Sequence, residues 1–148
     1  MEKLGRHDIR ALRKAFEDTC CTCSTYEQVI REFGPVRPFP MLKEAEERHM
    51  RALQALLERY RVALPKPRVT QPVHFASLSD ALEAAIAWES RKIEACERLH
   101  ASAHEADILA EIRNLRRASR DAHLPALREC ADVLKRFRKT PARSKTHA

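Results

Sequence analysis

Apolar residues recur along this chain at alternating steps of three and four, the spacing that gives a helix one buried face. The first such stripe predicts a helix over residues 8–33, with Asp8 as its N-cap and with Gly34 and Pro35 after its end. The members of this stripe are Ile9, Leu12, Phe16, Thr19, Cys23, Tyr26, Ile30 and Phe33. A stripe this regular is typical of a helix packed in a bundle.

Three further stripes predict helices over residues 40–60, 77–100 and 105–138, the second of these capped by Ser77. Prolines exclude a helix between residues 61 and 76, namely Pro65, Pro67 and Pro72. Fully extended, this connection could reach roughly 50 Å, farther than the ~30 Å length of a 20-residue helix. The pattern therefore predicts an all-α fold, a four-helix bundle with one long connection between its second and third helices.

The last helix has two features of its own. Pro125 removes a backbone donor and should kink the helix close to His123. Its apolar stripe is expected to run on past the kink, through Ala126, Cys130, Val133 and Phe137.

Composition and charge agree with one helical domain. The chain has only two glycines among 148 residues, and its net charge of +7 falls to +1 once the six basic residues of positions 135–148 are set aside. We predict a single domain over residues 1–138 and a basic flexible tail over residues 139–148. Contact with nucleic acid is not expected outside this tail. A solvated terminus is the favoured interpretation of the tail itself, because no aromatic residues accompany its basic ones.

The sequence offers no apolar stretch near the ~18–20 residues that a membrane span needs, and no apolar leader at its N-terminus. We therefore expect a cytoplasmic protein without membrane contact. We also expect the protein to be a homodimer.

Polar residues interrupt every stripe near its middle: Thr19 with Cys23, Glu46 with His49, Glu89, and Ser119 with His123. A buried carboxylate costs several kcal/mol unless it is paired or bound to metal. Two carboxylates and two imidazoles at one level of a bundle suggest a cation, and the Glu-x-x-His spacing puts two ligands on one helix face. The alternative is a polar cluster satisfied by Arg or Tyr partners, such as the hydroxyl of Tyr26 on a buried carboxylate.

Two stretches carry a resemblance to a known family. They are "STYEQVIREFGPVRPFPMLKEAEERHMRALQALLERYRVALPKP" and "NLRRASRDAHLPALREC", most specific in "FGPVRPF", "AEERH" and "HLPAL". Over Ile9 to Cys130, the chain resembles a bacterial ferritin-like domain family of unknown function, related to the rubrerythrin and ferritin superfamily. The resemblance implies a ferritin-like bundle with a crossover between helices 2 and 3. It also implies an iron centre and, for an enzyme, an oxidoreductase that uses dioxygen or peroxide.

The resemblance also implies a ligand set, which consists of Glu46, His49, Glu89 and His123. Thr19 and Arg120 stand where the family pattern has carboxylates. Losing two carboxylates favours an altered or mononuclear site over a di-iron centre.

Cysteines offer additional ligands. The five cysteines are an odd count, and in the cytoplasm they are expected to stay reduced. Cys20 and Cys23 are three apart and could join the metal ligands, in which case thiolates would favour zinc or Cu(I) over iron. Cys21 should be exposed or lie at a helix interface. Cys23 and Cys130 should approach each other if the first and last helices are parallel. Plain packing of the thiols is the alternative.

Three functions follow. The first is a ferritin-like metal-binding protein with an altered or mononuclear site, acting as an oxidoreductase or in metal handling. The second is a non-catalytic interaction protein with a degenerate di-iron site. The third is a thiol protein that binds Cu(I) or zinc or responds to redox changes.

Overall fold

The computed structural model describes residues 3–66 and 73–139, and all regular structure in these ranges is helical. The elements in chain order are α1 (Arg6–Phe33), α2 (Phe39–Arg59), α3 (Leu78–Ser102), α4 (Ala106–Ala118), a π-helical turn η1 (Ser119–His123) and α5 (Leu124–Lys139). The predicted all-α class is confirmed. The predicted tail lies outside the described residues from position 140 onward.

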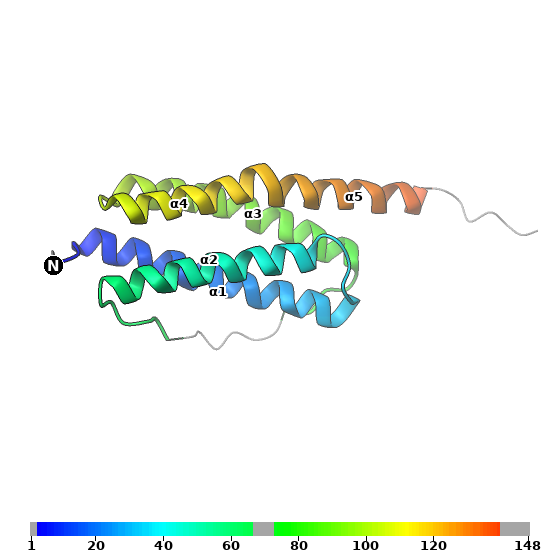
Figure 1. Cartoon of the computed structure of the whole chain (residues 1–148). Coiled ribbons are helices and arrows are strands. Elements are labelled where there is room, and N and C mark those ends of the chain that lie inside the picture. The colour runs from blue at the N-terminus through cyan, green and yellow to red at the C-terminus, as the bar shows by residue number, and fades with distance from the viewer. Residues whose placement is uncertain (1–2, 67–72, 140–148) are drawn as a thin grey trace, which may run out of the picture.

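The helices lie side by side in an up-down-down-up order (Figure 1). Helix α1 and the rod formed by α4, η1 and α5 run in one direction, whereas α2 and α3 run in the other. Helix α1 packs on α2 and α3, and α3 also packs on α4 and α5. Because α2 and α3 are parallel, the end of α2 and the start of α3 lie at opposite ends of the molecule (Figure 1). This placement agrees with the long connection predicted between the second and third helices.

The ends of the helices follow local sequence signals in two cases. Ser77 Oγ accepts a hydrogen bond from the Asp80 amide at 3.1 Å, so the predicted cap of α3 is confirmed. Gly34 ends α1 with a φ of 84°, a conformation that glycine adopts without a steric penalty, and its amide donates to the Ile30 carbonyl at 2.8 Å.

Asp8 does not cap its own helix, which corrects the prediction. Helix α1 begins two residues earlier, and Asp8 is buried within its first turn. Its Oδ1 accepts hydrogen bonds from the amides of His104 at 2.7 Å and Glu105 at 3.1 Å. Asp8 therefore fastens the start of α1 to the turn that leads into α4.

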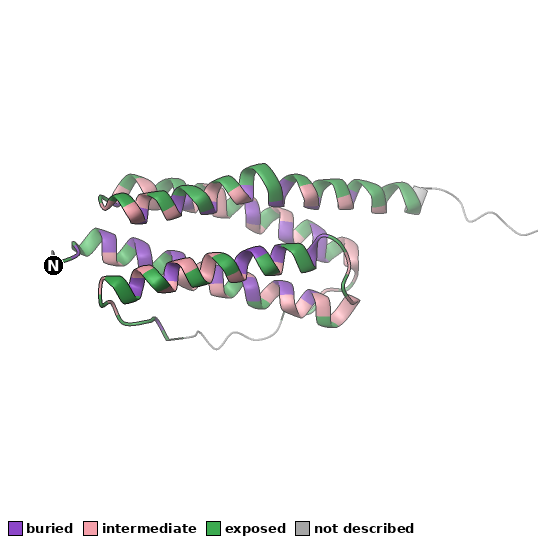
Figure 2. Ribbon diagram, viewed as in Figure 1, coloured by how far each residue is buried: buried purple, intermediate pink, exposed green. Residues whose placement is uncertain are grey.

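Buried positions recur along the helices (Figure 2). The apolar side chains among them form two clusters rather than one continuous core. One cluster joins the first half of α1 to the end of α2, the end of α3 and α4, and includes Leu12, Leu53, Leu57, Ile108 and Ile112. The other joins the second half of α1 to the starts of α2 and α3 and to α5, and includes Tyr26, Leu42, Leu82 and Leu127. Besides Asp8, five buried residues are polar and belong to neither cluster: Thr19, Glu46, Glu89, Ser119 and His123. We call this group the polar layer.

The predicted apolar stripe of the last helix is wrong beyond His123. The buried positions are Leu127 and Ala131 instead of Ala126 and Cys130, and Phe137 is 75% exposed. The reason is η1, in which the Leu124 amide donates to the Ser119 carbonyl, five residues back. A π-helical turn takes up one extra residue, so every later position shifts by one on the helix face. The disturbance expected near Pro125 thus takes this form.

None of the helices within the described ranges is both long and apolar enough to cross a membrane.

Candidate metal centre

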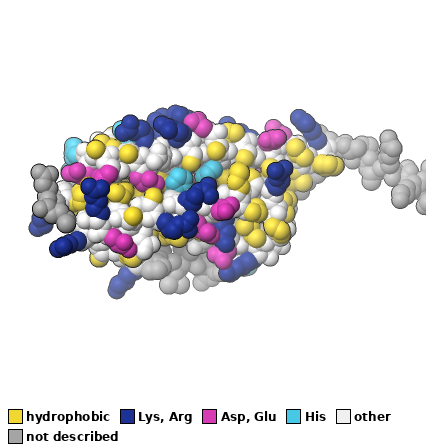
Figure 3. All heavy atoms as spheres, in the orientation of Figure 1, with side chains coloured by type: hydrophobic (Ala, Val, Ile, Leu, Met, Phe, Trp, Pro, Cys, Tyr) yellow, Lys and Arg dark blue, Asp and Glu magenta, His cyan; other side chains and the backbone are white. Residues whose placement is uncertain are grey.

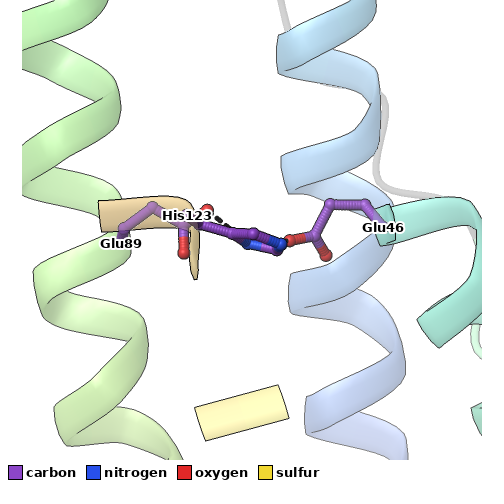
Figure 4. Close-up of side chains that lie close together, drawn as sticks. All are labelled: Glu46, Glu89 and His123. Carbon is purple, nitrogen blue, oxygen red and sulfur yellow. Dashed lines mark ion pairs between the residues drawn. The ribbon is translucent and has the colours of Figure 1, made fainter. Parts of the chain in front are cut away.

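Three buried side chains from separate helical elements meet in the polar layer. Glu46 comes from α2, Glu89 from α3 and His123 from η1, and a ligand atom of each lies within 4.8 Å of the others. The His123 ring lies between the two carboxylates (Figure 4). Its Nδ1 is 3.6 Å from Glu46 Oε1 and 3.5 Å from Glu89 Oε1. The hydrophobic stripes of the helices place these residues inward, because each occupies a position at the core-facing period.

The separations between these donor atoms fit a single small cation. A tetrahedral ion with bonds of ~2.0–2.1 Å holds its donors about 3.4 Å apart. The 3.5 and 3.6 Å separations from His123 Nδ1 are close to this value. Buried polar atoms at the same level have no hydrogen-bond partner among the described residues: Glu89 Oε2, His123 Nδ1 and Ser119 Oγ. Unpartnered buried groups are costly, and an ion at this position would satisfy His123 Nδ1. Two carboxylates and one imidazole suit zinc, iron or manganese.

Lys92 also belongs to this site, although it is not among the residues predicted from the sequence. Its Nζ donates to both oxygens of Glu46, at 2.6 and 2.7 Å, and its side chain is only 10% exposed. A signal for it exists in the sequence, because Ala85, Glu89, Lys92 and Cys96 follow steps of 4, 3 and 4 along α3.

Tyr26 holds the second carboxylate. Its hydroxyl donates to Glu89 Oε1 at 2.5 Å, as predicted for a buried polar cluster, and both side chains are fully buried. Burial raises the pKa of Glu89, but His123, Lys92 and Tyr26 together outweigh burial and lower this pKa to about 2. Burial and the neighbouring Glu89 raise the pKa of Tyr26 well above its usual value. Glu89 is therefore ionised and Tyr26 is protonated at neutral pH.

His49 is not brought into the three-residue group. Its Nδ1 lies 3.4 Å from Glu111 Oε1 on α4, and its ring centroid is 6.4 Å from that of His123. Glu111 escaped notice in the sequence because it lies beside Ile112 and not on the predicted stripe. His49 thus flanks the group and is paired with a carboxylate of its own.

Helix α1 contributes no carboxylate at this level. Thr19 is fully buried, and its hydroxyl donates to the Ala15 carbonyl of its own helix at 2.8 Å. Arg120, where a second carboxylate was expected from the resemblance, is exposed and pairs with Asp121 at 2.8 Å. The described residues thus offer donors for one ion, and the chain lacks the two carboxylates that the family pattern would use for a second.

The cysteines lie apart from the three-residue group, and all five are free thiols. Cys20 Sγ lies 3.3 Å from Met50 Sδ on α2, and Cys21 is exposed as predicted. Burial, followed by the charge of Glu47, raises the pKa of Cys23 to about 11. A protonated thiol is a poor metal ligand and a poor nucleophile at neutral pH.

The expected approach of Cys23 to Cys130 does not produce a disulfide bond. Cys130 lines a surface pocket together with Arg37, whereas Cys23 lies near Lys43 and Glu47 on α2.

The fold has a counterpart among solved structures. The crystal structure of the hypothetical protein MJ0754 from Methanococcus jannaschii is similar to it with a TM-score of 0.80. The two sequences are 20% identical, and the similarity covers 91% of this chain and 85% of that one. At this identity the likeness shows the fold alone. No protein-family model and no curated protein matches the sequence.

Proposed function

We propose that this protein is a ferritin-like four-helix bundle that binds one divalent metal ion through Glu46, Glu89 and His123. The observation that carries the proposal is the convergence of two buried carboxylates and one buried imidazole from three helical elements. The spacing of the donors supports the same conclusion. Glu89 Oε2 and His123 Nδ1, which have no hydrogen-bond partner among the described residues, also support it.

One ion suits this site better than two. Bridging a pair of irons in a helical bundle takes carboxylates from several helices, commonly four. Here Thr19 is neutral and bonded to its own helix, and Arg120 is on the surface. These two positions, which depart from the ferritin-like pattern, leave a mononuclear site as the arrangement that the remaining donors support.

The burial of the site limits the size of the reactants that can reach a bound ion. Glu46 and Glu89 are fully buried and His123 is 3% exposed, so a large substrate would have to displace core side chains to reach a bound ion. A bound ion would supply Lewis acidity or, in the case of iron, redox chemistry. We propose metal handling, or an oxidoreductase whose reactant is as small as dioxygen or peroxide.

Metal analysis tests the proposal directly. Protein purified without an affinity tag is analysed for metals, then stripped with a chelator and titrated with Zn²⁺ and, under anaerobic conditions, with Fe²⁺. We expect about one ion per chain in the wild type and at least a tenfold weaker affinity in Glu89→Gln and His123→Gln. Glu111→Gln is the matched control, because Glu111 is a partly buried carboxylate outside the group, paired with His49. Absence of stoichiometric binding, or equal losses in Glu111→Gln and Glu89→Gln, would contradict the proposal.

A second candidate is a metal-free bundle that acts through interactions. The observation in its favour is that each carboxylate already has a partner within the chain, Lys92 for Glu46 and Tyr26 for Glu89. In this case the polar layer is a degenerate metal site whose carboxylates are satisfied by Lys92 and Tyr26, and the titration above detects no stoichiometric metal.

As a partner in either case we propose a second copy of the chain. Three exposed apolar residues, Met41, Val133 and Phe137, line a surface pocket of about 850 Å³ between the start of α2 and α5. Hydrophobic side chains gather at this end of the molecule (Figure 3). A self-complementary apolar patch is what a two-fold homodimer requires.

A further inference from the structure

Lys92 lies where it must interfere with a metal ion. Its ammonium group donates to both oxygens of Glu46, at 2.6 and 2.7 Å. Among the described residues, the next nitrogen paired with Glu46 is His123 Nδ1, at 3.6 Å. The side chain that neutralises Glu46 in the metal-free site is therefore a lysine from α3.

An ion and this ammonium group compete for the same charge. An ion bound at ~2.0–2.2 Å from a Glu46 oxygen would lie only a few ångströms from the Lys92 nitrogen. The two buried carboxylates balance a divalent ion by themselves, so an ammonium group held beside that ion leaves an excess of buried positive charge. Like charges repel strongly in a poorly solvated interior.

Lys92 is the most exposed charged member of the site. Glu46 and Glu89 are fully buried, and Tyr26 fixes Glu89. Lys92 is 10% exposed and carries its charge on a flexible four-carbon stem that can place the charged end in water. A change of rotamer at Lys92 would free both Glu46 oxygens without moving a helix.

We propose that Lys92 is a built-in competitor of the metal ion. In the metal-free protein its ammonium group neutralises Glu46, and when an ion binds, the ammonium group moves to the solvent. This inference rests on the proposed function, since it concerns the same three ligands. Its consequence is that the protein stays folded without metal and releases its ion more readily than three buried ligands alone would allow.

The first test is the affinity for zinc. Zn²⁺ is titrated into chelator-stripped wild-type protein and Lys92→Met in competition with a chromophoric chelator. Methionine keeps the apolar stem and removes the charge, so we expect about tenfold tighter binding or more in the variant. Lys43→Met is the matched control, because Lys43 forms a more exposed ion pair with Glu47 on α2, and its affinity should equal that of the wild type.

The second test needs no variant. Wild-type protein is treated briefly with an amine-acetylating reagent with and without Zn²⁺, and the modified lysines are identified by peptide mass spectrometry. Lys92 should be protected in the metal-free protein and modified several-fold faster in the zinc-loaded protein. Lys14, which is 50% exposed and paired with Asp18, should react equally in both states.

The outcomes separate the two proposals. Zinc binding by the wild type, combined with unchanged affinity in Lys92→Met and unchanged labelling of Lys92, would overturn the competitor role and leave the metal site standing. Failure of both the wild type and Lys92→Met to bind zinc would overturn both. If Lys92→Met does not fold, the labelling of the wild-type protein decides.

Discussion

Replacing Tyr26 by phenylalanine should destabilise the metal-free protein far more than the same change at Tyr60. Tyr26→Phe removes one hydroxyl and leaves the ring, which packs edge-on against Phe39 with 5.8 Å between ring centroids. The lost hydrogen bond runs to an ionised carboxylate at 2.5 Å, and both partners are fully buried. Glu89 Oε2 already lacks a partner among the described residues, so Glu89 would lose its shortest hydrogen bond without access to water.

The magnitude follows from this geometry. Hydrogen bonds to charged groups contribute about 1.5–3 kcal/mol, and burial of both partners places this one near the upper end, at about 2–3 kcal/mol. Tyr60 also donates to a carboxylate, Asp107, at 2.7 Å, but this pair is only partly buried. Asp107 keeps the Arg59 guanidinium at 3.4 Å and gains water, so Tyr60→Phe should cost about 0.5–1 kcal/mol.

Urea unfolding of chelator-stripped protein, followed by circular dichroism, measures the difference. With a slope of about 2 kcal/mol per molar, Tyr26→Phe should lower the unfolding midpoint by about 1–1.5 M and leave the slope unchanged. Chelation matters because an ion bound to Glu89 would stabilise both proteins by an unrelated route. A loss in Tyr26→Phe no larger than that in Tyr60→Phe would refute the view that the polar layer depends on this hydrogen bond.

Other predictions test the fold and its surface. Asp8→Ala should lower the free energy of unfolding by about 1–2 kcal/mol, because two amides before α4 lose their acceptor, and an unchanged urea midpoint would refute this. In a thiol assay at pH 8, the exposed Cys21 should react at once. Burial raises the pKa of Cys23 to about 11, so the Cys23 thiol should react only when the protein unfolds. Phe137→Asp should weaken the proposed homodimer in analytical ultracentrifugation, and an unchanged dimer would exclude this surface.

Most of the helices could be predicted because the apolar residues of each helix recur at the spacing that places them on one buried face. The spacing of apolar residues does not show where a backbone hydrogen bond spans five residues instead of four. The buried face of α5 was therefore predicted one position too early after η1. Pro125 marked the place but not the form of the disturbance, because a missing amide is compatible with a kink or a π-helical turn.

The polar layer was partly predictable for a similar reason. Glu46, Glu89 and His123 stand out because they interrupt apolar stripes, and the structure brings all three together. Lys92 did not stand out, because a lysine usually points to water, although its place three residues after Glu89 and four before Cys96 put it on the inner face of α3.

The division of the apolar core into two clusters also affects how the protein unfolds. Each cluster is built from different halves of the same helices, and the polar layer between them offers charge and hydrogen bonds rather than continuous apolar contact. The two ends can therefore unfold as separate cooperative units, with different protection against amide hydrogen exchange. Amides of α5 beyond the π-helical turn should exchange together with those at the start of α2, and independently of α4, although α4 and α5 belong to one rod.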